Sequence, residues 1–232
     1  MNASILFRFR DPFGFPVAIH RSTALLFLLI VGLAVAMGGA PEDAALLVGA
    51  LILSIYIHEL GHAFACRSLG VAVHEVAIHG GGGYCRHDGA APPQEMLIVA
   101  AGPLASLALA VSARLAEAWA LDVARGAGGD AATLWWLKTA ARLGFLGEMN
   151  VVLCLLNLMP VLPLDGGRLL LLGLWRNLPY DRAMRFTGLV GVAVAALWLP
   201  AAFLLFQSYG FVLLFFPSIR DNWLRFLGRT NG

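Results

Sequence analysis

Charged residues are scarce in this chain of 232 residues. Asp, Glu, Lys and Arg together make up 13% of it, whereas a soluble domain carries about 25%. Apolar residues make up 59%, and the mean hydropathy is +0.78. These values exclude an ordinary soluble domain and indicate an integral membrane protein in a lipid bilayer. A chain of this length has room for about six spans of about 20 residues.

Cysteine is also rare, and basic residues are not concentrated anywhere. The three cysteines, Cys66, Cys85 and Cys154, contain no C-x-x-C pair and leave one over, so no disulfide framework is implied. The net charge is only +2, and the arginines are scattered along the predicted membrane edges, so nucleic acid is not an expected partner. Residues 1–16 hold no signal-peptide cleavage pattern. Neither an internal repeat nor a soluble domain stands out.

Apolar runs separated by turn residues predict an all-α membrane protein with about six transmembrane helices. The predicted spans are residues 23–37, 46–66, 94–113, 143–159, 185–199 and 203–216. Pro200 is expected to divide the last two. Residues 114–130 are predicted to be a polar loop, and residues 131–142 an amphipathic helix at the membrane interface.

Between Val71 and His87 the apolar residues alternate with polar ones, which predicts a short β-hairpin-like loop after the second helix. Gly81 and Gly82 lie in it, and backbone without side chains could offer an exposed edge to an unwound substrate strand. A flexible surface loop is the alternative. The histidines of this stretch are expected to be polar loop residues rather than metal ligands.

Basic residues predict the orientation in the membrane. If the N-terminus is cytoplasmic, twelve arginines fall on that side and four basic residues on the other. The positive-inside rule then places both termini in the cytoplasm. His58 would lie about 12 Å from the cytoplasmic end of its helix, at about 1.5 Å per residue.

The second predicted span contains His58-Glu59-Leu60-Gly61-His62. Histidines four residues apart project from one face of a helix and can bind the same metal ion, and Glu59 lies close enough to take a proton from a water molecule on that ion. A charged residue in the middle of a membrane span costs about 2.5–3.5 kcal/mol on insertion scales. Such a residue is therefore a functional candidate.

A catalytic zinc site usually has three protein ligands, so a third donor is expected at similar depth. Asp165 lies in Asn157-Leu158-Met159-Pro160-Val161-Leu162-Pro163-Leu164-Asp165-Gly166-Gly167, where prolines end a helix. Irregular backbone inside a membrane is tolerated where it is packed in protein or lines a watery cavity. The alternative is that Asp165 simply caps the next helix.

These two motifs resemble those of the site-2 protease family of intramembrane zinc metalloproteases. The chain matches H-E-x-x-H at residues 58–62 and N-x-x-P-x-x-P-L-D-G-G at residues 157–167. The resemblance implies that His58, His62 and Asp165 bind Zn²⁺ and that Glu59 is the catalytic base. It also implies a supporting role for Asn157, near the site and on the substrate carbonyl.

The resemblance covers residues 46–168, the predicted catalytic core of one membrane protease domain spanning residues 1–232. The family often has Asn where this chain has Ser106. This difference leaves open how the predicted span at residues 94–113 packs. Some members insert a PDZ domain before the fourth span. Here that loop is too short for a domain of at least about 50 residues, and the chain ends soon after the sixth span, which leaves no room for a CBS domain.

The predicted function is hydrolysis of a peptide bond in or near the transmembrane segment of single-pass membrane proteins, in a prokaryotic plasma membrane, with a regulatory membrane partner left open. Two other classes stay open. A membrane zinc carrier would need more ionisable residues in its spans, and an inactive membrane-helix-binding relative would have no need of Glu59. A zinc peptidase of the prenyl-protein type would need a later Glu as a ligand, and none follows Glu148.

Overall fold

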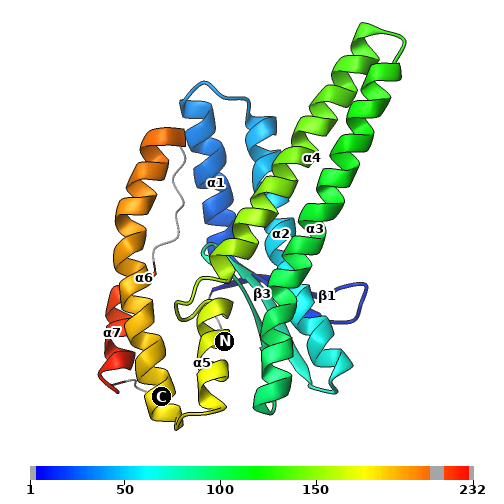
Figure 1. Cartoon of the computed structure of the whole chain (residues 1–232). Helices are drawn as coiled ribbons and strands as arrows, with labels where there is room; N and C mark the ends of the chain where they lie inside the picture. Colours follow the sequence, from blue (N-terminus) through cyan, green and yellow to red (C-terminus); the bar gives the residue numbers. More distant parts are fainter. Residues whose placement is uncertain (1–3, 210–216, 230–232) are drawn as a thin grey trace. The chain divides into compact units, whose positions relative to one another are not determined.

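The computed structural model describes residues 4–209 and 217–229. In chain order the elements are β1 (Ile5–Arg10), β2 (Pro16–His20), α1 (Arg21–Ala36), α2 (Pro41–Ser68), β3 (Val73–His79), β4 (Gly82–His87), α3 (Pro92–Gly126), α4 (Asp130–Asn157), α5 (Asp165–Trp175), α6 (Tyr180–Tyr209) and α7 (Ile219–Phe226) (Figure 1). They form two compact units. The first consists of Met1–Gly89 and Ala101–Cys154, and the second of Ala90–Ala100 and Leu155–Gly232.

The first unit contains a four-stranded sheet in the order β1-β2-β3-β4. The antiparallel pair β3–β4 confirms the predicted hairpin, but the two strands before α1 were not predicted, so the expectation of an all-α fold is incomplete. Strands β1 and β2 are short, with six and five residues, and the turn between them contains Pro12 and Gly14, so neither strand is long enough to show a clear alternation. Glu75 on β3 joins the strands, because its carboxylate accepts hydrogen bonds from Arg8 Nη2 at 2.9 Å and the Tyr84 hydroxyl at 3.0 Å.

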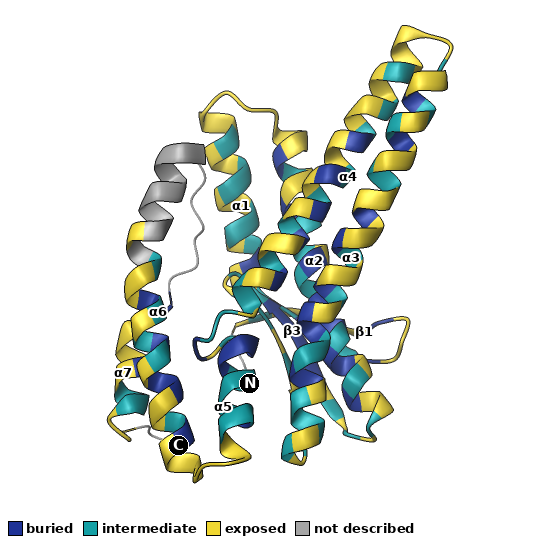
Figure 2. Ribbon diagram, in the orientation of Figure 1, coloured by how far each residue is buried: buried dark blue, intermediate teal, exposed yellow. Residues whose placement is uncertain are grey.

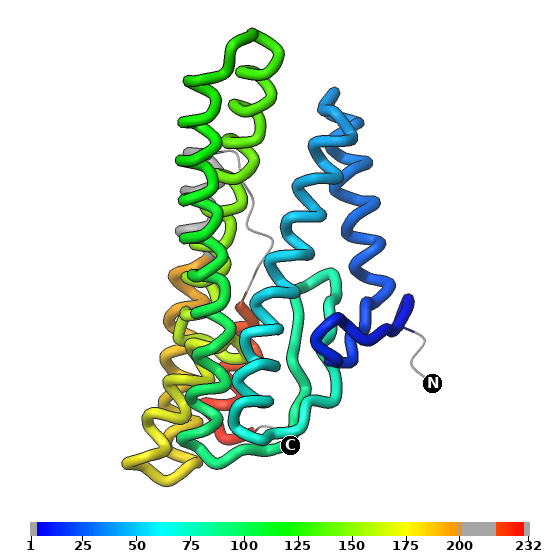
Figure 3. The backbone as a smooth tube through the Cα atoms, turned by 90° about the vertical axis from the view of Figure 1, so that its right-hand side faces the viewer, coloured from blue at the N-terminus to red at the C-terminus, as the bar shows by residue number. Residues whose placement is uncertain are grey.

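The sheet packs on the half of α2 that carries the histidines. A small core of Phe15, Val17, Leu60, Ala63 and Val76 is buried between them, and Figure 3 shows the β3–β4 hairpin running beside α2. This packing holds the backbone of β4 in place against the part of α2 next to His58.

Three helices among the described residues, α2, α3 and α4, are long and apolar enough to cross a membrane. Helix α1 is apolar but has only 16 residues. The predicted polar loop at residues 114–130 is wrong. Helix α3 continues to Gly126, and α4 begins at Asp130, so the predicted interfacial helix and the fourth span form one helix.

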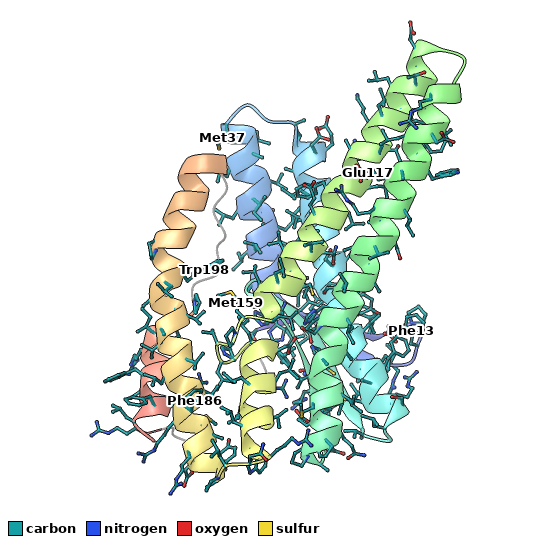
Figure 4. The ribbon with its side chains drawn as sticks, in the orientation of Figure 1. Phe13, Met37, Glu117, Met159, Phe186 and Trp198 are labelled. Atoms are coloured by element: carbon teal, nitrogen blue, oxygen red, sulfur yellow. The ribbon has the colours of Figure 1, made fainter. Side chains whose placement is uncertain are left out.

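Ion pairs and small residues explain why α3 and α4 extend so far. The two helices run side by side (Figures 1 and 3). Arg114 pairs with Glu117 at 2.8 Å and lies 3.8 Å from Glu148 on α4. Glu117 lies between the helices (Figure 4), where a Cβ at Gly144 would approach its Oε1 to 2.5 Å. The polar residues thus stabilise the helix hairpin instead of ending it.

The predicted division at Pro200 is also wrong. In the second unit, α6 runs without interruption from Tyr180 to Tyr209 with Pro200 inside it. A proline inside a helix removes one backbone hydrogen bond, a loss that helices in a bilayer tolerate when nearby groups satisfy the freed carbonyl. Residues 210–216 of the predicted sixth span lie outside the described residues. Helix α5 of the same unit buries its first turn and exposes its last residues (Figure 2).

Candidate metal centre

The two histidines of α2 converge on one point. His58 and His62 are 4% and 6% exposed, and their Nε2 atoms lie 3.3 Å apart. Two nitrogens that bind one zinc ion at about 2.0–2.1 Å with a tetrahedral angle lie about 3.3 Å apart. The spacing of four residues therefore gives the geometry of a shared ion.

Ser106 on α3 orients the first of these rings. Its Oγ lies 2.9 Å from His58 Nδ1, and both residues are buried. In the metal-binding tautomer, Nδ1 carries the hydrogen and donates it to Ser106, which leaves the Nε2 lone pair for the ion. From the sequence, Ser106 is expected to affect only the packing of its helix. Ser106 lies one helical turn after Gly102, so the two residues share a helix face and meet the same neighbouring helix.

Glycines allow α3 to pass directly over the histidines. A Cβ at Gly102 would lie 2.2 Å from His62 Nε2 and 2.8 Å from His58 Nε2. On α2, directly before His62, a Cβ at Gly61 would lie 2.4 Å from the Ala101 carbonyl oxygen. A side chain at residue 102 would therefore clash with both rings, and glycine leaves the room in which they converge.

The side chain of Glu59 is buried beside the histidines, at 5% exposure. Strand β4 covers it, since a Cβ at Gly83 would lie 2.7 Å from Glu59 Cγ and 2.8 Å from its Oε1. β4 is also an edge strand of the sheet. The structure thus places one face of this edge strand over the carboxylate, and the contacting glycine is Gly83 rather than the predicted Gly81 or Gly82.

Gly81 and Gly82 lie at the tip of the same hairpin. Gly81 precedes β4 and is exposed, and Gly82 begins β4 with a φ of +132°, which favours glycine. The Gly81 amide donates to His79 Nδ1 at 3.1 Å. Burial, and to a lesser degree the neighbouring His20, lower the pKa of His79. His79 is therefore neutral at pH 7, and its contacts are those of a structural residue of the hairpin tip.

Asp165 belongs to the second unit and is 7% exposed. It is the first residue of α5, and the capping position is Leu164, which makes no side-chain cap. The N-cap alternative for Asp165 is therefore wrong. The preceding turn packs against glycine, since a Cβ at Gly166 would lie 2.1 Å from the Leu158 carbonyl oxygen. Asn157, the last residue of α4, lies half-buried just before this turn.

Arg168, one turn into α5, also belongs to this unit. Its Nη2 donates to Glu95 Oε1 on the first turns of α3 at 2.5 Å. This contact joins the start of α5 to the start of α3. Asn150 in the first unit is fully buried and donates to Ser54 Oγ at 2.9 Å, which agrees with a packing role.

Among the described residues, His58 and His62 offer two buried imidazoles in the first unit, and Asp165 offers a buried carboxylate in the second. Two imidazoles and one carboxylate are a donor set suited to catalytic zinc, which keeps its fourth position open. The convergent Nε2 atoms and the space left by Gly102 fit the same ion.

Replacing Ser106 with Ala should weaken zinc binding without unfolding the protein. The hydrogen bond to His58 Nδ1 would be lost, and a neutral hydrogen bond contributes about 0.5–1.5 kcal/mol, or about 2- to 10-fold in affinity. Competition with a fluorescent chelator measures this change. Ser112→Ala is the matched control, because Ser112 lies on the exposed side of α3 and bonds only its own helix at Ala108. Equal zinc affinity in the two variants would rule out the orienting role of Ser106.

The chain is similar to known proteins. The model of peptidase family M50 matches residues 46–120 and 120–198. Rip3 of Mycobacterium tuberculosis is 37% identical over 176 residues, which are 71% of this chain and 42% of that protein. The zinc metalloprotease MJ0392 of Methanocaldococcus jannaschii is 27% identical over 199 residues, which are 86% of this chain and 54% of that protein. The chain thus spans about half the length of these curated relatives.

A solved structure shares the fold. The site-2 protease from Methanocaldococcus jannaschii aligns with 96% of this chain and 93% of its own, with a TM-score of 0.57 and 22% identity. At this identity the likeness concerns the fold alone. The family model, by contrast, matches more than half of the chain and includes both the histidine pair and Asp165. The chain belongs to peptidase family M50.

Proposed function

We propose that the protein is an intramembrane zinc metalloprotease that hydrolyses a peptide bond in or near the transmembrane segment of single-pass membrane proteins. The observation that carries the proposal is the pair of His58 and His62 Nε2 atoms, 3.3 Å apart and next to the buried Glu59, on a helix apolar enough to cross a membrane. Membership of family M50 and the zinc metalloprotease name of a relative support it.

In this proposal His58, His62 and Asp165 hold the zinc ion. When bound in such a site, zinc acts as a Lewis acid and lowers the pKa of water toward about 7. Ser106 keeps the His58 ring oriented, and Gly102 leaves the ion its space. The three protein donors leave one position for water and substrate.

Glu59 moves the proton. Its carboxylate takes a proton from the attacking water and passes it to the amide nitrogen as the C–N bond breaks, which yields one new carboxyl end and one new amino end. Asn157 is proposed to hold the substrate carbonyl through its side-chain amide. Burial of Glu59 under β4 keeps bulk water from competing for this proton.

The hairpin is proposed to receive the substrate. The backbone groups of a transmembrane helix are satisfied internally, so the helix must unwind before a carbonyl can be attacked. An unwound segment can pair with an exposed strand edge, and β4 is an edge strand whose Gly83 lies against Glu59. Gly81 and Gly82 would keep the approach to that edge free of side chains.

We further propose one membrane protease domain over residues 1–232, with residues 46–168 as its catalytic core. It would lie in a prokaryotic plasma membrane with both termini cytoplasmic, and a membrane partner would regulate access. Helices α1 to α4 would supply four of its crossings.

The test is cleavage of single-pass peptides by the purified protein in detergent, read by mass spectrometry. We expect cuts within the apolar segments, loss of cutting after chelation, and recovery when zinc is returned. A soluble peptide without an apolar segment serves as the control substrate. Zinc binding with no cleavage of any peptide in the panel would contradict the proposal and favour an inactive relative.

A further inference from the structure

Helix α7 buries one polar residue completely. Asn222 is 0% exposed, although α7 is short and otherwise largely at the surface. The helix packs on α6 where α6 carries glycines. A Cβ at Gly191 would lie 2.3 Å from Asn222 Oδ1, and a Cβ at Gly188 would lie 2.6 Å from the Phe226 amide nitrogen. The glycines of α6 therefore set how deeply Asn222 is inserted.

The amide of Asn222 joins α7 to the turn before Asp165. Its Nδ2 donates to the Leu162 carbonyl oxygen at 3.0 Å and to the Ser218 carbonyl oxygen at 2.9 Å. The first bond leaves the helix, and the second stays within it. Asn222 Oδ1 is buried without a hydrogen-bond partner among the described residues. Burying a polar atom without a partner is unfavourable, so packing alone does not explain an asparagine here.

Leu162 lies in the irregular segment that carries Asp165. Residues 158–164 are not helical, and Leu162 is itself buried. This segment also meets α5, since a Cβ at Gly167 would lie 2.4 Å from the Val161 carbonyl carbon and 2.6 Å from the Leu162 amide nitrogen. The segment is thus in contact with both a glycine of α5 and the side chain of Asn222.

We infer that Asn222 is a positioning residue for the metal site. By holding the Leu162 carbonyl, it fixes the turn that delivers Asp165, so zinc affinity depends on a helix near the end of the chain. The inference rests on the proposed function, in which Asp165 is a zinc ligand. Outer hydrogen bonds that orient metal ligands change metal affinity by about 10- to 100-fold.

The test compares zinc dissociation constants, measured by chelator competition on the purified full chain. Asn222→Ala removes the donor, and Gly191→Ala pushes the same side chain out with a carbon 2.3 Å from its Oδ1. We expect both variants to bind zinc about tenfold more weakly. Two controls should bind zinc like the parent: Gly173→Ala on α5, where a Cβ meets nothing within 4 Å, and Trp223→Ala on α7, where the side chain is 45% exposed.

Thermal unfolding of the zinc-free proteins separates positioning from structural support. A residue that only stabilises α7 would lower the unfolding temperature and leave zinc affinity unchanged, and that result for Asn222→Ala would overturn the inference. If Asn222→Ala does not fold, Asn222→Asp, which keeps the shape and removes the amide donor, takes its place. Asp165→Ala is measured in parallel. If it binds zinc like the parent, the ligand assignment itself fails. If it loses zinc while Asn222→Ala and Gly191→Ala do not, only the positioning role fails.

Discussion

Replacing Glu59 with Gln is expected to lower kcat/KM for peptide cleavage by about 10²- to 10⁴-fold, the usual contribution of a general base. The amide has the shape of the carboxylate but cannot accept the proton of the attacking water. Zinc should stay bound, because the proposed ligands are His58, His62 and Asp165. The buried position of Glu59 under β4 leaves little room for another base to replace it.

The measurement combines the cleavage rate with the zinc content of the same sample. Glu148→Gln is the matched control, because Glu148 is a well-exposed carboxylate on α4 whose recorded ion pair is with Arg114. A Glu59→Gln protein that cuts as fast as the parent would show that the base is another group. A variant that loses both zinc and activity would instead assign Glu59 to metal binding.

The second large effect is expected from Gly102→Ala. The added carbon would lie 2.2 Å from His62 Nε2 and 2.8 Å from His58 Nε2, and it would push the two rings away from the position in which they converge. Forcing side chains apart in a packed interior costs about 1–3 kcal/mol, and an effect at the upper end corresponds to roughly 100-fold weaker zinc binding. Alanine is a better helix former than glycine by about 1 kcal/mol, so α3 itself should not be destabilised.

This prediction is checked by zinc competition and thermal unfolding of the zinc-free protein. Gly49→Ala on α2 is the control, because a Cβ there meets nothing within 4 Å. We expect Gly49→Ala to bind zinc like the parent and Gly102→Ala to bind it far more weakly while unfolding at a similar temperature. Normal zinc affinity in Gly102→Ala would mean that the ion does not occupy the space beside residue 102.

The sequence was sufficient to place the two histidines on one helix face, because their spacing alone determines it. Histidines four residues apart must share a helix face, and α2 places them as predicted. The alternation after Gly70 likewise predicted the hairpin that became β3 and β4. Both features are local, so neighbouring residues were enough to define them. The strands before α1 were missed because β2 is stabilised by pairing with β3, a partner distant in sequence, and β1 pairs in turn with β2.

The errors and omissions concern long-range contacts. Arg114 and Glu117 look like the end of a span, but their ion pair and the contact with Glu148 keep them in the helix hairpin. Gly83, Gly102 and Ser106 acquire their roles from elements that meet α2 only in three dimensions. Asn222 gives no signal in the sequence, because its partner, the Leu162 carbonyl, is a backbone atom of a distant turn.

X-ray absorption spectroscopy of the zinc-loaded protein, with the Asp165→Ala variant beside it, tests most directly whether the ion joins the two motifs. We expect two imidazole nitrogens and a carboxylate oxygen at about 2.0–2.2 Å from zinc, and we expect the carboxylate contribution to be lost in the variant. Identical spectra for the parent and Asp165→Ala, or zinc bound without the imidazoles of His58 and His62, would contradict a site that joins the two motifs.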